Sequence, residues 1–432
     1  MSKTSNLFAG LILAMASAAM LASAPAQAGA VLSYRVLHTF CTKNFSCPDG
    51  LTPAGDLVRD VGGDLFGTTL AGGRNNAGTL YKLFPKHGGT RYFEHVLRSF
   101  CFSGKCGTGS HPGTGVIMDT AGNLYGTTPA NGDSACGTVY ESVISGDEAG
   151  MKPLYTFDAP NDACSPTGLT YQGKDAGQLY DGTSPLFGLT LQGGANGHGA
   201  LYELTPPRPG HKRWQEKILV SFCGLAFCTD SDTPQSNLVM DAAGDLFFAT
   251  THNKIMRVVP DSGFYVMTLA YRSHTNENYD ALGIDTDGTL IGLAGSGGTT
   301  NSGTLFKLTF DPVNGYEYTL LHDFCPTDCS DGSFPLAVTA DSSGNIFGVT
   351  EHGGSGTDPF GPDDGGGVLF EYSSGGAYFV LHNFCVETNC TDGGVPSSGL
   401  TLDGNGNFFG VTAAGGLPFS GGAGVVYELS AF

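Results

Sequence analysis

The sequence has 432 residues, a formal net charge of −20 at pH 7, 67 glycines and 12 cysteines. The acidic balance argues against a nucleic-acid-binding or anionic-membrane surface, since both need a positive field, and it disfavours a polyanionic glycan as a partner. Because the glycines follow no Gly-X-Y period and aromatic residues make up 11% of the chain, the composition indicates many turns rather than collagen or disorder.

Residues 1–28 have the organisation of an export signal. Lys3 lies in a short polar region, an apolar run extends from Leu7 to Ala24, and Ala26-Gln27-Ala28 is a small-residue cleavage motif. We expect cleavage after Ala28 and a protein that is secreted, either extracellular or periplasmic. No later stretch reaches the ~18 apolar residues that span a bilayer, so we expect no membrane insertion. An even number of cysteines after the signal fits a compartment in which disulfides persist.

Self-similar phrases divide residues 29–432 into seven units. The phrase Asp119-Thr-Ala-Gly-Asn-Leu-Tyr-Gly-Thr-Thr128 is repeated closely or loosely, and the other copies begin at Asp60, Pro185, Asp241, Asp285, Asp341 and Asp403. A phrase of the type Gly78-Thr-Leu-Tyr-Lys-Leu83 follows each copy. A third phrase ends in an aromatic residue, at Phe40, Phe100, Phe157, Phe222, Tyr271, Phe324 and Phe384, with gaps of 49 to 65 residues.

Each unit predicts four short strands, which we name A to D. In the first complete unit they cover residues 56–60, 64–69, 78–84 and 91–100, which are rich in Leu, Val, Tyr and Phe and bounded by Gly, Asp and Asn. Four-stranded units with a period of about 50 residues are typical of propeller blades. The sequence therefore predicts an all-β fold, a seven-bladed β-propeller of four-stranded antiparallel blades. We expect one domain over residues 29–432 and a monomer.

The two ends of the chain complement each other. Residues 33–40 have the pattern of a D strand with no A, B or C strand before it, whereas the last unit has A, B and C strands within residues 399–428 and no D strand. We expect the N-terminal strand to complete the last blade. This pairing would close the ring and leave no exposed strand edge at that point.

The repeated phrases resemble a known family. Gly-Asn-Leu-Tyr-Gly-Thr-Thr, a Gly-Gly loop, Gly-Thr-Val-Tyr and a Leu-x-x-Phe strand are similar to the tandem GloVer repeat of exported bacterial proteins, over essentially the whole mature chain. The resemblance implies an extracellular repeat protein of no assigned activity. Members often end in a cell-surface anchor, which we do not expect in this chain, and the family supplies no catalytic residues.

Ten cysteines form local pairs in loops that run from a D strand to the next A strand. The expected disulfides are Cys41–Cys47, Cys101–Cys106, Cys223–Cys228, Cys325–Cys329 and Cys385–Cys390, since loops this short allow the Cα separation of ~4.4–6.8 Å that a disulfide needs. Cys136 lies in a B–C loop and Cys164 in the next D–A loop. Both kinds of loop emerge on one face of an up-and-down blade, so we expect a cross-blade Cys136–Cys164 disulfide. Zinc ligation is the less favoured alternative.

The repeats deviate most in blades four and five. The B–C loop of blade four is Thr251-His252-Asn253-Lys254 in place of a Gly-Gly loop, and the next D–A loop has no cysteine. The ligand-binding candidates there are His252, Lys254, Arg272, His274 and Glu277. The catalytic candidates are His252, Arg272, His274, Glu277 and Tyr279, with His274 or Tyr279 as general base and Arg272 neutralising a carboxylate. The alternative is a degenerate blade with solvated polar loops.

Two further groups of polar residues have competing interpretations. Acidic residues of the same loops, Asp331, Asp392, Asp363 and Asp364, have the oxygen ligands that suit Ca²⁺. Asp before Gly is also ordinary turn chemistry and no EF-hand spacing is present, so we favour turns and expect no cofactor. His38, His322 and His382 alternate with apolar residues on the predicted outermost strand and are expected to face outward.

The sequence favours a secreted, non-catalytic binding or surface-interaction protein. It would use the face formed by the D–A and B–C loops for a glycan or an extracellular protein, because a rigid scaffold with elaborated loops is a common layout for binding. The alternative is a secreted carbohydrate-active enzyme, a polysaccharide lyase or glycoside hydrolase, at the propeller mouth near blades four and five. That alternative requires the candidate side chains to converge around one pocket at the mouth.

Overall fold

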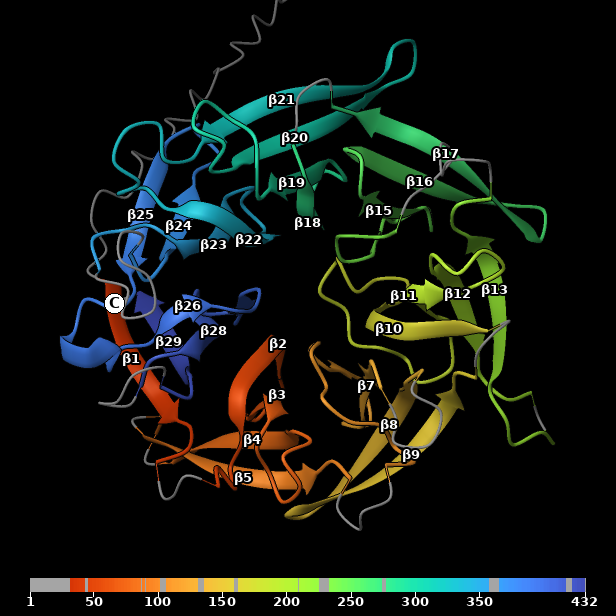
Figure 1. Cartoon of the computed structure of the whole chain (residues 1–432), viewed down its shortest axis with the longest axis horizontal. Helices are drawn as coiled ribbons and strands as arrows, with labels where there is room; N and C mark the ends of the chain where they lie inside the picture. The colour runs from red at the N-terminus through yellow and green to blue at the C-terminus, as the bar shows by residue number, and fades with distance from the viewer. Residues whose placement is uncertain are drawn as a thin grey trace, which may run out of the picture.

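Seven antiparallel sheets form a ring in the computed structural model of the chain (Figure 1). The structure describes residues 32–42, 46–86, 88–89, 91–101, 106–130, 136–158, 162–208, 210–224, 233–273, 277–356, 365–416 and 422–431. The expected export signal lies outside these ranges. Within them, no helix is long and apolar enough to cross a membrane.

The first three blades each contain four consecutive strands. Blade one contains β2 (Leu51–Arg59), β3 (Leu65–Ala71), β4 (Thr79–Lys86) and β5 (Arg91–Ser99). Blade two contains β6 (Ile117–Met118), β7 (Leu124–Thr128), β8 (Thr138–Ser145) and β9 (Glu148–Thr156). Blade three contains β10 (Ala163–Thr170), β11 (Leu186–Gly193), β12 (Ala200–Thr205) and β13 (Gln215–Ser221).

The next three blades repeat the plan. Blade four contains β14 (Val239–Met240), β15 (Leu246–Thr250), β16 (Lys254–Asp261) and β17 (Phe264–Arg272). Blade five contains β18 (Tyr279–Ile284), β19 (Leu290–Ala294), β20 (Thr304–Asp311) and β21 (Gly315–Asp323). Blade six contains β22 (Ser333–Ala340), β23 (Ile346–His352), β24 (Val368–Tyr372) and β25 (Tyr378–Asn383).

The seventh blade joins the two ends of the chain. It contains β26 (Gly394–Pro396), β27 (Thr401–Leu402), β28 (Phe408–Ala414), β29 (Val425–Ala431) and β1 (Leu32–Thr39), and a short 3-10 helix, η2 (Thr388–Cys390), precedes it. β1 pairs antiparallel with β29, from Leu32 opposite Ala431 to Thr39 opposite Val425. The predicted fold and its closure by the N-terminal strand are thus confirmed.

Side chains of neighbouring blades form the core between the sheets. The aromatic residue after one D strand inserts into the next blade and meets a ring of that blade: the ring centroids of Phe40 and Tyr81 are 5.1 Å apart, and those of Phe324 and Phe370 are 5.3 Å apart. All four rings are fully buried. These contacts give the recurrent aromatic residue of each unit a packing role.

Local geometry explains why the repeated phrase contains a glycine and an aspartate. A Cβ added at Gly126 would lie 2.5 Å from the hydroxyl of Tyr140 on the neighbouring strand, so no larger residue fits there. Asp119 Oδ1 accepts hydrogen bonds from the backbone N of Ala121 (2.9 Å) and of Asn123 (2.8 Å), which closes the turn between the A and B strands.

Candidate functional site

The B–C and D–A loops lie on one face of the ring, which we call the loop face. The Cys136–Cys164 disulfide joins a B–C loop of blade two to the D–A loop that enters blade three, with the Cα atoms 4.4 Å apart. The local disulfides Cys41–Cys47, Cys101–Cys106, Cys325–Cys329 and Cys385–Cys390 are present in D–A loops. Cys223 is disulfide-bonded, and its expected partner Cys228 lies outside the described residues.

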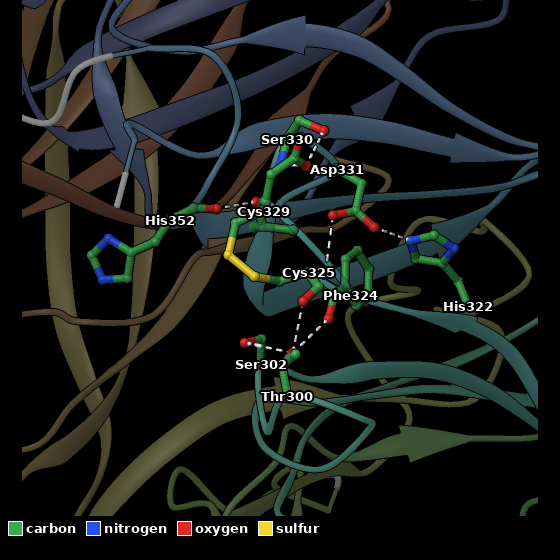
Figure 2. The surroundings of a disulfide bond; sticks show 11 residues. Thr300, Ser302, His322, Phe324, Cys325, Cys329, Ser330, Asp331 and His352 are labelled. Atoms are coloured by element: carbon green, nitrogen blue, oxygen red, sulfur yellow. Dashed lines mark hydrogen bonds and ion pairs between the residues drawn. A yellow bond between two sulfur atoms is a disulfide. The ribbon is translucent and has the colours of Figure 1, made fainter. Parts of the chain in front are cut away.

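A local disulfide forms a compact unit, which we call a knot. In the knots of Cys41–Cys47, Cys325–Cys329 and Cys385–Cys390, an aspartate after the second cysteine belongs to this unit. In the knot of Cys325 and Cys329, Asp331 accepts one hydrogen bond from the Cys325 backbone N (3.0 Å) and is hydrogen-bonded to His322 Nε2 at 2.8 Å (Figure 2). Asp392 has the same role in the last knot, where it accepts from the backbone N of Val386 at 3.0 Å. Both aspartates, proposed from the sequence as turn residues or calcium ligands, therefore hold loop backbone.

The histidines of the D strands pack between blades, so the expectation that they face outward was wrong. The ring of His322 stacks on Tyr378 of blade six with centroids 3.8 Å apart, and His382 stacks on Tyr34 of blade seven at 3.7 Å. Burial lowers the pKa of His382 to about 4. Alternation along an edge strand did not reveal this packing, because the outer strand of one blade is covered by the next blade.

Hydrogen bonds link the knots to the Gly-Gly loops on both sides. Thr300, in the B–C loop of blade five, donates to the Cys325 carbonyl at 2.8 Å (Figure 2), and the Gly354 backbone N in the B–C loop of blade six donates to the Cys329 carbonyl at 2.8 Å. Asn196 of blade three likewise donates to the Phe222 carbonyl at 2.9 Å. The loop face is thus a series of knots and Gly-Gly loops that are joined by hydrogen bonds.

This series of knots and loops is interrupted between blades four and five. In blade four only Thr251, His252 and Asn253 lie between the paired residues Thr250 and Lys254, whereas nine residues lie between the paired residues Ala294 and Thr304 of blade five. His252 and Asn253 adopt positive φ values of 70° and 61°. The shortened loop and the absence of a knot coincide, which makes this part of the loop face unlike the rest.

A residue exchange fills the core at the interruption. After blade five, the backbone N of the inserted residue Phe324 donates to the Gly303 carbonyl at 3.0 Å. After blade four, the Ser273 backbone N donates to the Asn253 carbonyl at the same distance, so Ser273 occupies the position of the inserted aromatic residue. The ring of Tyr279, six residues later, takes its place against Phe306 at 5.0 Å. Tyr271, the aromatic residue that ends the third phrase of this unit, is therefore not the structural counterpart of Phe324; it stacks on Tyr318, at 5.3 Å.

Glu277 lies in the cysteine-free D–A loop that enters blade five, two residues before β18. Its side chain accepts hydrogen bonds from the Tyr279 hydroxyl at 3.0 Å and the Tyr318 hydroxyl at 3.2 Å, and the residue is 7% exposed. Burial and the charge of Glu277 raise the pKa of Tyr279 far above its usual range, and burial also raises the pKa of Tyr318. Both tyrosines are therefore proton donors to a carboxylate at neutral pH.

A pocket of about 450 Å³ opens beside Glu277, within the size range of small-molecule sites. Its other polar walls are Thr299, Asn301, Thr304, Tyr318 and Asp323, and Leu320 supplies an apolar wall. Residues of β20 and β21 line the pocket, and none of β18 does. β21 is the outer strand of blade five and β18 the inner strand (Figure 1). Sequence reasoning missed the contributions of β20 and β21, although Ala294 in place of the usual threonine marks this blade as different.

The candidates from the sequence do not form one cluster. Glu277 and Tyr279 are in contact. Lys254 is buried and is paired in register with Arg272, and the side chains of Arg272 and His252 are both exposed. His274, Asp363 and Asp364 lie outside the described residues. Among the described residues, no three His, Cys, Asp or Glu side chains are grouped so as to hold a metal ion.

Comparisons with known proteins identify the repeat and the fold. A family model described as the Gloeobacter/Verrucomicrobia repeat matches residues 18–257 and 251–431. No curated protein sequence matches the chain. Among solved structures, virginiamycin B lyase from Staphylococcus aureus matches with 12% identity and a TM-score of 0.53, covering 93% of this chain and all of that one.

Two more solved structures support the same fold. A streptogramin B lyase matches with 15% identity and a TM-score of 0.55 over 92% of this chain and 97% of that one. A fungal alcohol oxidase in complex with copper matches with 12% identity and a TM-score of 0.54 over 92% of this chain and 76% of that one. At these identities the likeness concerns the propeller fold alone.

Proposed function

The chain belongs to the Gloeobacter/Verrucomicrobia repeat family, and from this premise and the loop face we propose that it is a non-catalytic binding protein that acts outside the cytoplasm. The partner is a glycan or an extracellular protein that contacts the D–A and B–C loops. The observation that carries the proposal is the pocket beside Glu277, set in a face whose other loops are braced by disulfides. Loops held in one conformation bind with little loss of entropy.

Binding is preferred to catalysis because of the chemistry at Glu277. A general base must be able to lose its proton near neutral pH, but the Tyr279 hydroxyl is buried, donates to Glu277 and has a raised pKa. Arg272 is exposed on the strand that precedes this loop. The alternative, a polysaccharide lyase or glycoside hydrolase at the propeller mouth, thus loses Tyr279 as its base.

The test is a screen of the purified mature protein on a glycan array and a panel of polysaccharides and secreted proteins, with and without EDTA. Each binder is then incubated with the protein, and the products are analysed by mass spectrometry. We expect saturable binding without new products. Turnover of any polysaccharide would refute the non-catalytic proposal.

The export part of the proposal has a separate test. The intact chain is expressed in a Gram-negative host, and the protein from the periplasm and the medium is analysed by intact-mass measurement. We expect a mature chain that begins at Gly29, after cleavage behind the Ala26-Gln27-Ala28 motif. Retention of the full-length chain in the cytoplasm would contradict it.

A further inference from the structure

The pocket beside Glu277 combines acidic groups with an absence of basic ones. Two carboxylates, Glu277 and Asp323, line it, and none of the described side chains that line it is a lysine, arginine or histidine. Asp323 already accepts hydrogen bonds from the Thr299 backbone N, 3.1 Å from each of its oxygens. A ligand that fits must therefore supply hydrogen-bond donors, and a positive charge on the ligand would be stabilised by both carboxylates.

Thr304 provides a second, independent indication of a ligand. Its hydroxyl oxygen is buried and lines the pocket. The neighbouring Tyr318 hydroxyl donates to Glu277, so Thr304 can donate to the Tyr318 oxygen but receives no hydrogen bond from the described residues. In blade one the equivalent Thr79 is paired with Thr69 at 2.9 Å, whereas in blade five Ala294 stands at the position of Thr69. The Thr304 oxygen is therefore a buried acceptor without a donor, which is costly, and a donor from a ligand would remove that cost.

The walls also exclude some ligand types. Tyr318 lies between Tyr271 and Phe306, with ring centroids 5.3 Å and 5.2 Å away and all three rings nearly parallel. Neither face of Tyr318 is therefore free to stack on a ligand, so a flat aromatic molecule is a poor fit. A sugar acid is disfavoured because its carboxylate would face Glu277 and Asp323.

We propose that this pocket binds the protonated amino group of an amino sugar carried by a glycan. The ammonium group donates to Glu277 and to the Thr304 hydroxyl, and the sugar hydroxyls pair with Asp323, Thr299 and Asn301 at the rim. A lysine side chain would bring the same charge, but its four methylene groups would leave those rim groups without partners. This inference rests on the proposed function, since it names the glycan that the loop face recognises.

The pocket has a matched pair of positions for a test. Leu320 of β21 lies opposite Phe306 and is 50% exposed at the pocket wall; Leu269 of β17 lies opposite Met256, is 52% exposed and does not line the pocket. Leu320→Arg places a guanidinium group where the ligand amine would bind. Leu269→Arg adds the same charge to the same strand position of blade four. Because both side chains are half exposed, we expect both variants to fold.

Isothermal titration calorimetry is carried out with glucosamine oligosaccharides and with the corresponding N-acetylated oligosaccharides, which lack the charge. We expect the free amines to bind about tenfold or more tightly than the acetylated forms, and Leu320→Arg and Glu277→Gln each to weaken binding by about tenfold or more. Leu269→Arg should bind like the wild type. Circular dichroism and a melting curve establish that each variant is folded, and the Leu320→Arg result stands alone if Glu277→Gln does not fold.

Other outcomes separate this inference from the proposed function. Equal affinity for free and acetylated amines, or full binding by Leu320→Arg, would overturn the pocket assignment. The proposed glycan-binding function would still stand. Equal competition by a lysine-rich peptide would overturn the choice of a sugar. Binding of other glycans on the array but of no amino sugar would overturn the choice of an amino sugar. Binding of no glycan and no protein would refute the proposed function itself.

Discussion

His382 is a single residue whose protonation is coupled to folding. It lies between blades six and seven, stacked on Tyr34, and burial lowers its pKa from 6.5 to about 4. An unfolded chain takes up a proton on this side chain near pH 6.5, whereas the folded chain does so only near pH 4. The unfolded state therefore binds more protons between these values, and stability falls as the pH falls through this window.

The first prediction is a pH-dependent stability difference at this position. The shift corresponds to at most about 3 kcal/mol of the free energy of unfolding, present at pH 7 and lost by pH 4. His382→Phe keeps a ring against Tyr34 and removes the titration. Urea unfolding at pH 7, 5.5 and 4 should show a smaller loss for the variant than for the wild type. His211→Phe, at an exposed position between β12 and β13, is the control and should follow the wild type.

Tyr279 and Tyr140 give opposite predictions for the same substitution. Removing the Tyr279 hydroxyl leaves the buried Glu277 carboxylate with one fewer donor, so Tyr279→Phe should lower the free energy of unfolding at pH 7 by about 1–3 kcal/mol. The Tyr140 hydroxyl is buried and has no hydrogen-bond partner, so Tyr140→Phe should cost nothing or stabilise. Chemical denaturation of both variants measures the difference. Equal losses would show that Glu277 does not depend on the Tyr279 hydroxyl.

At the scale of elements, the repeats predicted the strands and the loop face because each strand phrase occurs seven times with the same turn residues. The sequence did not predict where Tyr279 lies. Its ring replaces an aromatic residue that stands six positions earlier in other blades, and such an exchange leaves no local pattern. The walls of the pocket were missed for a similar reason, since Thr304 and Leu320 come from ordinary strand positions.

The disulfides allow a prediction about how elements are joined. The Cys136–Cys164 disulfide links two blades, and its cysteines are 28 residues apart in the sequence. The cysteines of the Cys325–Cys329 disulfide lie in one loop and are four residues apart. In the loop-entropy description the first contributes about 3–4 kcal/mol and the second about 2 kcal/mol. Cys136→Ser/Cys164→Ser should therefore lower the free energy of unfolding more than Cys325→Ser/Cys329→Ser. Denaturation of the two double variants checks this order, and the reverse order would show that native contacts outweigh chain entropy.

At the scale of the whole molecule, the ring depends on one strand far away in sequence. In blade seven β1 pairs with the strand β29, with Leu32 opposite Ala431, and Arg35 forms an ion pair with Glu428. Tyr34 of the same strand donates a hydrogen bond to the Asp392 carbonyl and packs on Tyr427. The end of β29 and the start of β1 are thus neighbours, as in a hairpin whose turn is missing.

A circular permutant tests this closure directly. An Asn-Gly turn joins Ala431 to Leu32, because such a turn suits a two-residue hairpin, and the chain is opened between Thr42 and Ser46, so that Cys41 and Cys47 can still form their disulfide. We expect the permutant to fold, with a free energy of unfolding within about 2 kcal/mol of the wild type, since every strand pair is retained. Circular dichroism and urea unfolding measure this. A matched chain that lacks residues 32–40 leaves β29 as an exposed edge and should aggregate or unfold. If the truncated chain were as stable as the permutant, β1 would not be what holds the ring closed.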